Sequence, residues 1–293
     1  MLLYIYSKTK DLDQVKGLLD KGWPDVKYFR WNSFSRLFYP FILYRTLGKH
    51  TIERVYLGYP YNIRAHIANT CNTDTWLLDD GTFTLRLNKD LGEPQSALWK
   101  APSLADRLLR RRVGASYLKR VSFFTNYDIS PPQGQSVVQN KFASIKSQII
   151  AQDSGEHVLF IGSPIESLTY PCEKLFLELM KKIQGFYKGR EITYALHRLE
   201  SIHQREAQLG PLGIRVVRFE TPLEVAIYEE GVSPYEVASF VSSALGNLHQ
   251  IYGISARSFI LPEESILGDH KEAITKLYND FEKRKISVID LDR

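Results

Sequence analysis

Two adjacent carboxylates and a glycine, Asp79-Asp80-Gly81, are the first residues of this chain whose types and spacing could do chemistry. They follow the short apolar run Trp76 to Leu78, which is typical of a buried strand, and the glycine lets the backbone turn there. In an open α/β sheet such an edge faces the ligand crevice, where a carboxylate can remove a proton from a substrate hydroxyl. Asp-Asp-Gly is also ordinary turn chemistry, and a plain turn is the alternative interpretation.

Polar residues also end two strand-like runs in the second half of the chain. Gly162 and Ser163 end the run that begins at His157. The glycine would let a ligand come close to the backbone, and the serine would supply a hydroxyl donor. A plain turn is again the alternative. His197 ends the run that begins at Ile192, where it can donate to a phosphate or act as an acid. The alternative is a polar residue that simply leaves the sheet.

Two predicted helix starts follow. Glu224 lies in the first turn after Thr221-Pro222, where it could accept hydrogen bonds from a ribose or merely stabilise the helix N-terminus. Ser242 and Ser243 open a helix after a short strand-like run. Free backbone N–H groups at a helix N-terminus, with hydroxyls beside them, form an anion site whose natural occupant is a phosphate. One serine acting as the N-cap is the alternative, and both interpretations can hold together.

The elements that must position these residues alternate along the chain. The strand-like runs are Leu2–Tyr6, Arg54–Pro60, Thr75–Leu78, His157–Pro164, Ile192–His197, Ile214–Phe219, Ser258–Pro262 and Ile286–Asp290. Helical spacing of apolar residues covers Glu173–Tyr187 and Lys271–Lys285. This alternation predicts an α/β fold with largely parallel sheets. Breaker-rich segments at 130–136 and 153–156 place a domain boundary near residue 150, with a ligand cleft between two α/β domains.

Composition bounds the class of protein. The chain has 293 residues, of which 44% are hydrophobic and 24% charged, as expected for a soluble globular protein with one large or two medium domains. The two cysteines, Cys71 and Cys172, lie far apart, and no Cys/His ligand spacing occurs, which argues against a zinc site and favours a reducing compartment. No run approaches transmembrane length, and the N-terminus is typical of a first strand and not of a secretion signal.

The net charge of +5 is unevenly spread. A basic stretch runs from Arg107 through Arg110-Arg111-Arg112 to Lys119-Arg120, with leucines between the charges. It could lie against anionic lipid, bind nucleic acid, or form a solvated helix face. Nothing else in the sequence favours nucleic acid, because neither a recognition-helix pattern nor a zinc finger is present.

Taken in order, these motifs resemble those of bacterial sialyltransferases, whose short motifs are Asp/Glu-Asp-Gly, His-Pro and Ser-Ser/Thr. The sequence is most similar to the group that sialylates lipooligosaccharide or capsular glycans, and the motifs span roughly residues 75 to 250. The resemblance implies a GT-B type fold of two Rossmann-like domains facing across a cleft, 1–150 on the acceptor side and 151–293 for the CMP-sugar. It also implies CMP-sialic acid as donor, a glycan or glycolipid acceptor, and no metal or other cofactor.

The resemblance assigns roles to individual residues. Asp80 matches the general base that deprotonates the acceptor hydroxyl. His197 matches the histidine that contacts the donor phosphate and assists departure of CMP. Ser242 and Ser243 match the pair that binds the phosphate, and Glu224 matches a glutamate that holds the cytidine ribose.

One residue departs from the family pattern, because Arg198 follows the histidine where the family has proline. Proline would fix the backbone there and arginine cannot, although its charge could support the phosphate. Asp79, next to the proposed base, is a second candidate for a supporting role, and Gly162 and Ser163 join the donor site by their strand-end position.

Two other functions remain compatible with the sequence. One is a glycosyltransferase of the same fold that uses a different nucleotide sugar. The other is a non-catalytic, membrane-associated glycan-binding protein, which would keep the basic and aromatic surface but would not need Asp80. For the enzyme we expect a cytoplasmic protein, peripheral on the inner face of the cytoplasmic membrane and held there by residues 107–120. The sequence does not indicate the acceptor sugar, the linkage or the oligomeric state.

Overall fold

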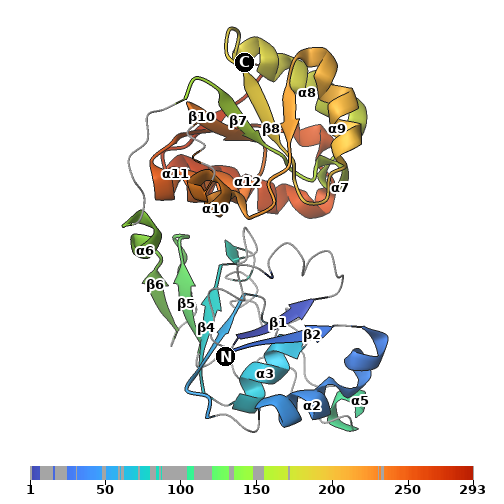
Figure 1. The fold of residues 1–293 in the computed structure, drawn as a ribbon, viewed down its shortest axis with the longest axis vertical. Helices are drawn as coiled ribbons and strands as arrows, with labels where there is room; N and C mark the ends of the chain where they lie inside the picture. Colours follow the sequence, from blue (N-terminus) through green and yellow to red (C-terminus); the bar gives the residue numbers. More distant parts are fainter. Residues whose placement is uncertain are drawn as a thin grey trace. The chain divides into compact units, whose positions relative to one another are not determined.

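The computed structural model divides the chain into two compact units, Met1–Asn140 (unit 1) and Lys141–Arg293 (unit 2) (Figure 1). The structure describes residues 2–6, 16, 25–30, 32–47, 51–58, 60, 63–71, 73–79, 84–85, 87, 104–108, 121–131, 135–147, 155–170, 172–229, 231 and 234–292. The division falls after residue 140, whereas the sequence-based boundary near 150 lies in 148–154, outside the described residues.

Unit 1 contains two parallel sheets. The smaller pairs β1 (Leu2–Tyr6) with β2 (Val26–Arg30), and the larger has the order β3-β4-β5-β6. The strands of the larger sheet are β3 (Arg54–Leu57), β4 (Asp74–Leu78), β5 (Val121–Thr125) and β6 (Ser136–Gln139). The described helices are α2 (Ser33–Leu47), α3 (Ile63–Cys71) and α5 (Leu104–Leu108). Tyr39 and Leu43 of α2 join Leu77 and Phe123 of the sheet in one core.

Unit 2 is a six-stranded, all-parallel sheet of order β12-β11-β10-β7-β8-β9. The strands are β7 (Val158–Ile161), β8 (Ile192–Ala195), β9 (Arg215–Val217), β10 (Glu236–Ser239), β11 (Ser255–Phe259) and β12 (Ser287–Ile289). The helices are α6 (Ala143–Lys146), α7 (Ile165–Leu168), α8 (Cys172–Phe186), α9 (Ile202–Leu209), α10 (Leu223–Glu229), α11 (Ser243–Tyr252) and α12 (Gly268–Lys283), with short 3-10 turns at Gly210–Leu212 and Glu263–Ser265. Counted along the chain, the strand order is 3-2-1-4-5-6, the arrangement of dinucleotide-binding sheets.

The central strand β7 shows why these residues form a buried parallel sheet. It pairs with β10 on one side and β8 on the other, and all four of its side chains are buried. Val158 and Phe160 point into one core, with α8, while Leu159 and Ile161 point into the other, with α10 and α11. Helices therefore cover both faces, which explains the continuous apolar run in place of alternation.

The expected fold class, α/β with parallel sheets in each of two units, is confirmed. The expected strands and the two long helices are present with ends shifted by a few residues. Sequence reasoning missed β2, β5, β6, α2 and α3. β6 lies next to the breaker-rich segment and has only partly buried or exposed side chains, so its sequence lacks an apolar signal. α2 contains Pro40 and carries apolar residues on its buried and its exposed sides, which hides helical periodicity.

We expect Phe160→Ala to lower the free energy of unfolding of unit 2 by about 3–5 kcal/mol, because truncating a buried phenylalanine leaves a cavity. Phe160 is fully buried, and its ring lies 5.7 Å from that of Tyr194 and 5.1 Å from that of Phe240. Hydrogen exchange of the β7 and β8 amides measures the change. Tyr170→Ala, at a residue 75% exposed, is the control and should change the stability little. Equal effects of the two substitutions would contradict this account of the core.

Candidate functional site

The strand order of unit 2 reverses between β7 and β10, and open α/β sheets bind their ligands at such a switch point. Gly162 and Ser163 directly follow β7, and Ser242 and Ser243 come just after β10. His197 follows β8, the other neighbour of β7. The structure therefore brings five of the predicted site residues to the carboxyl edge of three adjacent strands.

Ser163 links the ends of β7 and β10 through buried hydrogen bonds. The Ser239 hydroxyl donates to the carbonyl of Ile161 at 2.9 Å, so the Ser163 hydroxyl donates to Ser239 Oγ at 3.2 Å. Ser163 Oγ also accepts the Val241 N–H at 3.4 Å. Because Ser163 is buried and its proton is used inside the protein, its geometry ties β7 to β10.

The N-terminus of α11 follows directly after Val241, whose N–H is bonded to Ser163. Ser242 occupies the N-cap position with extended backbone, but its hydroxyl makes no capping hydrogen bond. Ser242 and Ser243 are both half-buried. The N–H groups of the first helical turn point out of the helix end, and together with the two hydroxyls they can bind an anion.

Glu224 lies in the first turn of α10 and connects that helix to α11. Its Oε1 accepts a hydrogen bond from Asn247 Nδ2 at 2.7 Å, and its carbonyl accepts one from the Tyr252 hydroxyl. Burial, followed by the nearby Glu224 carboxylate, raises the pKa of Tyr252, so this hydroxyl remains a donor. The half-buried Glu224 is thus fixed against the helix whose N-terminus faces the switch point, and its contact with a ribose stays a prediction.

His197 begins a tight four-residue turn. The Glu200 N–H donates to the His197 carbonyl at 2.9 Å, and the His197 N–H donates to Glu200 Oε2 at 2.8 Å. The Leu199 N–H donates to His197 Nδ1 at 3.3 Å. Arg198 and Leu199, at the tip, are exposed. These hydrogen bonds restrain the backbone around Arg198, the residue that stands where bacterial sialyltransferases have proline.

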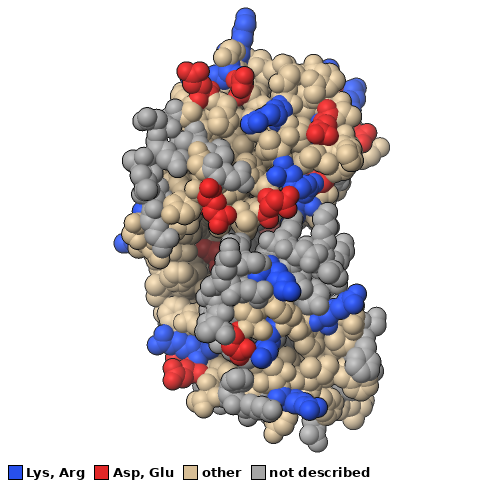
Figure 2. All heavy atoms as spheres, viewed as in Figure 1, with Lys and Arg blue, Asp and Glu red and all other residues tan. Residues whose placement is uncertain are grey.

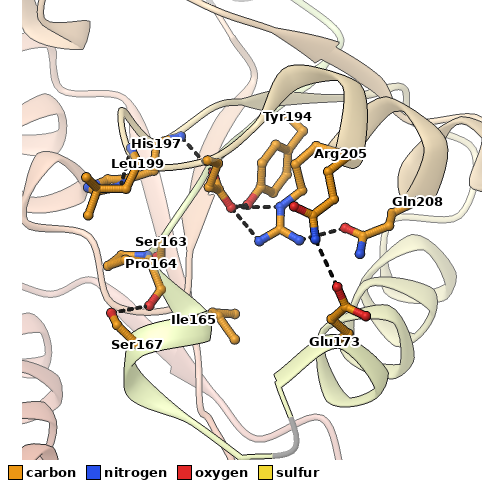
Figure 3. A network of polar contacts seen from close by, with 12 residues as sticks. Ser163, Pro164, Ile165, Ser167, Glu173, Tyr194, His197, Leu199, Arg205 and Gln208 are labelled. Carbon is orange, nitrogen blue, oxygen red and sulfur yellow. Dashed lines mark hydrogen bonds and ion pairs between the residues drawn. The ribbon is translucent and has the colours of Figure 1, made fainter. Parts of the chain in front are cut away.

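Glu200 belongs to a buried ion pair that sequence reasoning missed. Its Oε1 lies 2.7 Å from Arg205 Nη2 and 2.8 Å from both Arg205 Nε and the Tyr194 hydroxyl. The side chains of Arg205 and Glu200 are 1% and 2% exposed. Figure 3 shows His197 and Leu199 on one side of this network and Arg205 with Gln208 on the other. Glu200 and Arg205 lie in a polar stretch that is typical of a solvated helix, so the sequence gives no signal that they are buried.

Gly162 is required by the same network. A Cβ at this position would lie 2.4 Å from Glu200 Oε2, 2.7 Å from the His197 nitrogen and 2.9 Å from the Ala195 carbonyl oxygen. Two of these atoms belong to the backbone and cannot move aside independently. The glycine thus lets the end of β7 approach the His197 turn closely, and the predicted approach of a ligand to Gly162 stays a prediction.

In unit 1, Asp79 directly follows β4 and joins it to β5. Its Oδ2 accepts the Asn126 N–H at 2.7 Å, and its Oδ1 accepts the Thr84 hydroxyl at 3.0 Å. Asp79 is half-buried and acts as a structural tie at this sheet edge. Asp80, the predicted base, lies outside the described residues, and its role stays a prediction.

Only the start of the basic stretch is described. Arg107 is exposed, and Leu104 and Leu108, one turn apart on α5, are 73% and 74% exposed. Figure 2 shows basic and acidic side chains of the described residues interspersed on the face drawn. Within the described residues, no helix has the length and apolar character needed to span a bilayer. The same residues contain no group of three or more His, Cys, Asp or Glu placed to hold a metal ion.

No protein-family model matches the chain, and no curated protein matches it. Among solved structures it is similar to MurG from Acinetobacter baumannii, with 13% identity, a TM-score of 0.46, and coverage of 99% of this chain and 86% of that one. It is also similar to MnaA from S. aureus in a co-structure with UDP (10% identity, TM-score 0.43, 97% and 88% covered). A third is UDP-GlcNAc 2-epimerase from Neisseria meningitidis bound to UDP-GlcNAc, with 13% identity, a TM-score of 0.44, and coverage of 93% of this chain and 76% of that one. Likeness at this level assigns neither a substrate nor a reaction to the chain.

We expect Gly162→Ala to displace the His197 turn and to destabilise unit 2 by about 1–3 kcal/mol, the usual cost of overpacking. Gly185→Ala is the matched control. Gly185 lies in α8, and a Cβ added there would meet no neighbouring atom within 4 Å, so alanine should be neutral or stabilise by up to about 1 kcal/mol. Thermal unfolding and the amide chemical shifts of residues 195–200 measure both effects. Undisturbed shifts in Gly162→Ala would contradict the close approach.

Proposed function

We propose that the chain is a glycosyltransferase that binds the phosphate of a nucleotide-sugar donor at the β7–β10 switch point of unit 2. The observation that carries the proposal is the gathering of His197, Ser242 and Ser243 at the carboxyl edge of a sheet with the 3-2-1-4-5-6 order. Ser163 and Gly162 shape that edge through the hydroxyl pair with Ser239 and the packing against the His197 turn, and their contact with the donor stays a prediction.

The site suits departure of a phosphate leaving group. Negative charge grows on the leaving oxygen in the transition state, and hydrogen-bond donors already aimed at it stabilise that state most effectively. The first N–H groups of α11 and the two serine hydroxyls are such donors. His197 can add a further donor, because its Nδ1 already accepts the Leu199 N–H and its neutral ring then carries the proton on Nε2.

The finer assignment rests on the resemblance to bacterial sialyltransferases. Under it the donor is CMP-sialic acid, Glu224 holds the cytidine ribose, and Asp80 deprotonates the acceptor hydroxyl of a glycan or glycolipid. A positioned base of this kind contributes about 100- to 10,000-fold to the rate. The exposed Arg107 and Leu108 open the basic stretch through which we propose attachment to an anionic membrane surface.

The donor class has a direct test. CMP and CMP-sialic acid should raise the melting temperature of the protein, because a ligand that binds only the folded state stabilises it by mass action. UDP- and GDP-sugars at the same concentration should not. Protection by UDP- or GDP-sugars alone would contradict the sialic acid assignment and would leave a glycosyltransferase for another donor.

Catalysis is tested through the predicted base. Asp80→Asn should lower sialic acid transfer at least about 100-fold, since removing a general base costs on the order of 10²–10⁴ in rate, while CMP affinity stays unchanged. Asp128→Asn, at an exposed position of the same unit, is the matched control and should leave transfer unchanged. Transfer and CMP affinity are measured separately, by product formation and by calorimetry. Undiminished transfer by Asp80→Asn would identify another base, and CMP-independent glycan binding without transfer would favour a binding protein.

A further inference from the structure

We propose that Glu200 is a positioning residue for His197: its buried carboxylate fixes the His197–Glu200 turn so that the imidazole presents Nε2–H as a donor at the sheet edge. The inference rests on the proposed function only in naming the donor phosphate as the group that this N–H meets. The positioning itself follows from contacts inside unit 2.

The turn has two reciprocal hydrogen bonds between its first and last residues. The backbone of Glu200 donates to the carbonyl of His197, and the side chain of Glu200 accepts the His197 N–H. The geometry holds the peptide of Leu199 where its N–H reaches His197 Nδ1. With Nδ1 acting as an acceptor, the neutral ring carries its proton on Nε2, and this tautomer presents Nε2–H as a hydrogen-bond donor.

The two oxygens of the Glu200 carboxylate have different partners. Oε1 accepts from Arg205 and from Tyr194, all within the core. Within the described residues, Oε2 accepts from the backbone of His197. Arg205 is itself held from three directions, because its guanidinium also lies 3.9 Å from the centre of the Phe176 ring and its Nη1 donates to Gln208 at 2.6 Å. One oxygen therefore fixes the carboxylate, and the other is directed at the turn.

A second ion pair of unit 2 offers a comparison, with a buried carboxylate (Glu236, 3% exposed) and a half-buried Arg257 side chain (23% exposed). Glu236, at the start of β10, accepts from Arg257 Nε at 2.9 Å through Oε1 and from Arg257 Nη2 at 3.0 Å through Oε2. The Tyr187 hydroxyl also donates to its Oε1. Both oxygens of Glu236 thus serve side chains. Buried ion pairs are seldom needed for stability, since apolar residues of similar volume often replace them without loss, so the backbone partner of Glu200 suggests a different purpose.

Two double variants separate positioning from stability. Glu200→Leu with Arg205→Met removes the charges and the acceptor, and Glu200→Gln with Arg205→Met removes the charges but keeps an amide oxygen that can accept the His197 N–H. Both avoid leaving an unpaired buried charge. His197→Ala is the reference for complete loss of the imidazole's contribution to CMP affinity. His203→Ala, at a side chain 93% exposed on α9, is the reference for no loss.

The affinity for CMP, measured by calorimetry on the full chain, should fall about tenfold or more in the leucine variant and in His197→Ala, a loss typical of a hydrogen bond to a charged group. It should remain near the wild-type value in the glutamine variant and in His203→Ala. Thermal unfolding of each variant checks that the fold is retained. Equal CMP affinity in the leucine and glutamine variants, in a protein whose CMP affinity falls on His197→Ala, would overturn the proposal.

The ring nitrogens of His197 provide a readout that needs no ligand. Their ¹⁵N chemical shifts in the wild-type protein should show the Nε2–H tautomer at a pH where the ring is neutral, and the leucine variant should show a mixture. A wild-type ring protonated mainly on Nδ1 would overturn the proposal. If the tautomer is as expected but His197→Ala leaves CMP affinity unchanged, the positioning is correct and the assignment of His197 to the donor phosphate fails.

Discussion

The carboxylate of Glu200 lies in the interior of unit 2, where a charge without partners would cost several kcal/mol. Its surroundings satisfy that charge with Arg205, with Tyr194 and with the backbone of His197. Each of these partners comes from a different part of the β8–α9 segment, so the charge draws the strand end, the turn and the helix together. The Glu200 charge thus helps to set the shape of the sheet edge after β8, together with the hydrogen bond from Arg218 Nη2 to the Glu200 carbonyl.

A second constraint acts at the switch point itself. There the chain leaves β7 toward one side of the sheet and β10 toward the other. The helices that follow the two strands therefore do not pack between the strand ends, which must be held together by other contacts. The hydroxyls of Ser163 and Ser239 do this with small polar groups that occupy little space. The protons of the buried serines are used inside the protein, so the donors offered to an anion at this edge are the first N–H groups of α11 and the hydroxyls of Ser242 and Ser243.

Sequence reasoning succeeded where apolar patterning decides the outcome. Val158–Ile161 and the stripe of α8 are apolar because both faces of the sheet are covered, and that pattern is visible without coordinates. It also placed Gly162 and His197 after strands and Ser242 at a helix start, because the ends of elements can be recognised by the polar residues that follow them. It failed for Glu200 and Arg205, since a buried charge in a polar stretch has the same letters as a solvated one. Ser163 was predicted to offer a hydroxyl to a ligand, but its inward hydrogen bonds were not predicted, because they depend on Ser239, which is distant in sequence.

The closeness of Gly162 to Glu200 has a consequence for how this chain can diverge. Any side chain at position 162 needs the space that the Glu200 carboxylate now occupies, and retreat of that carboxylate would release Arg205 and the turn. Exchanging Glu200 as well would not remove the conflict, because the His197 nitrogen and the Ala195 carbonyl oxygen belong to the backbone. Distant relatives that keep this turn are thus expected to keep glycine at position 162, whatever residue stands at position 200.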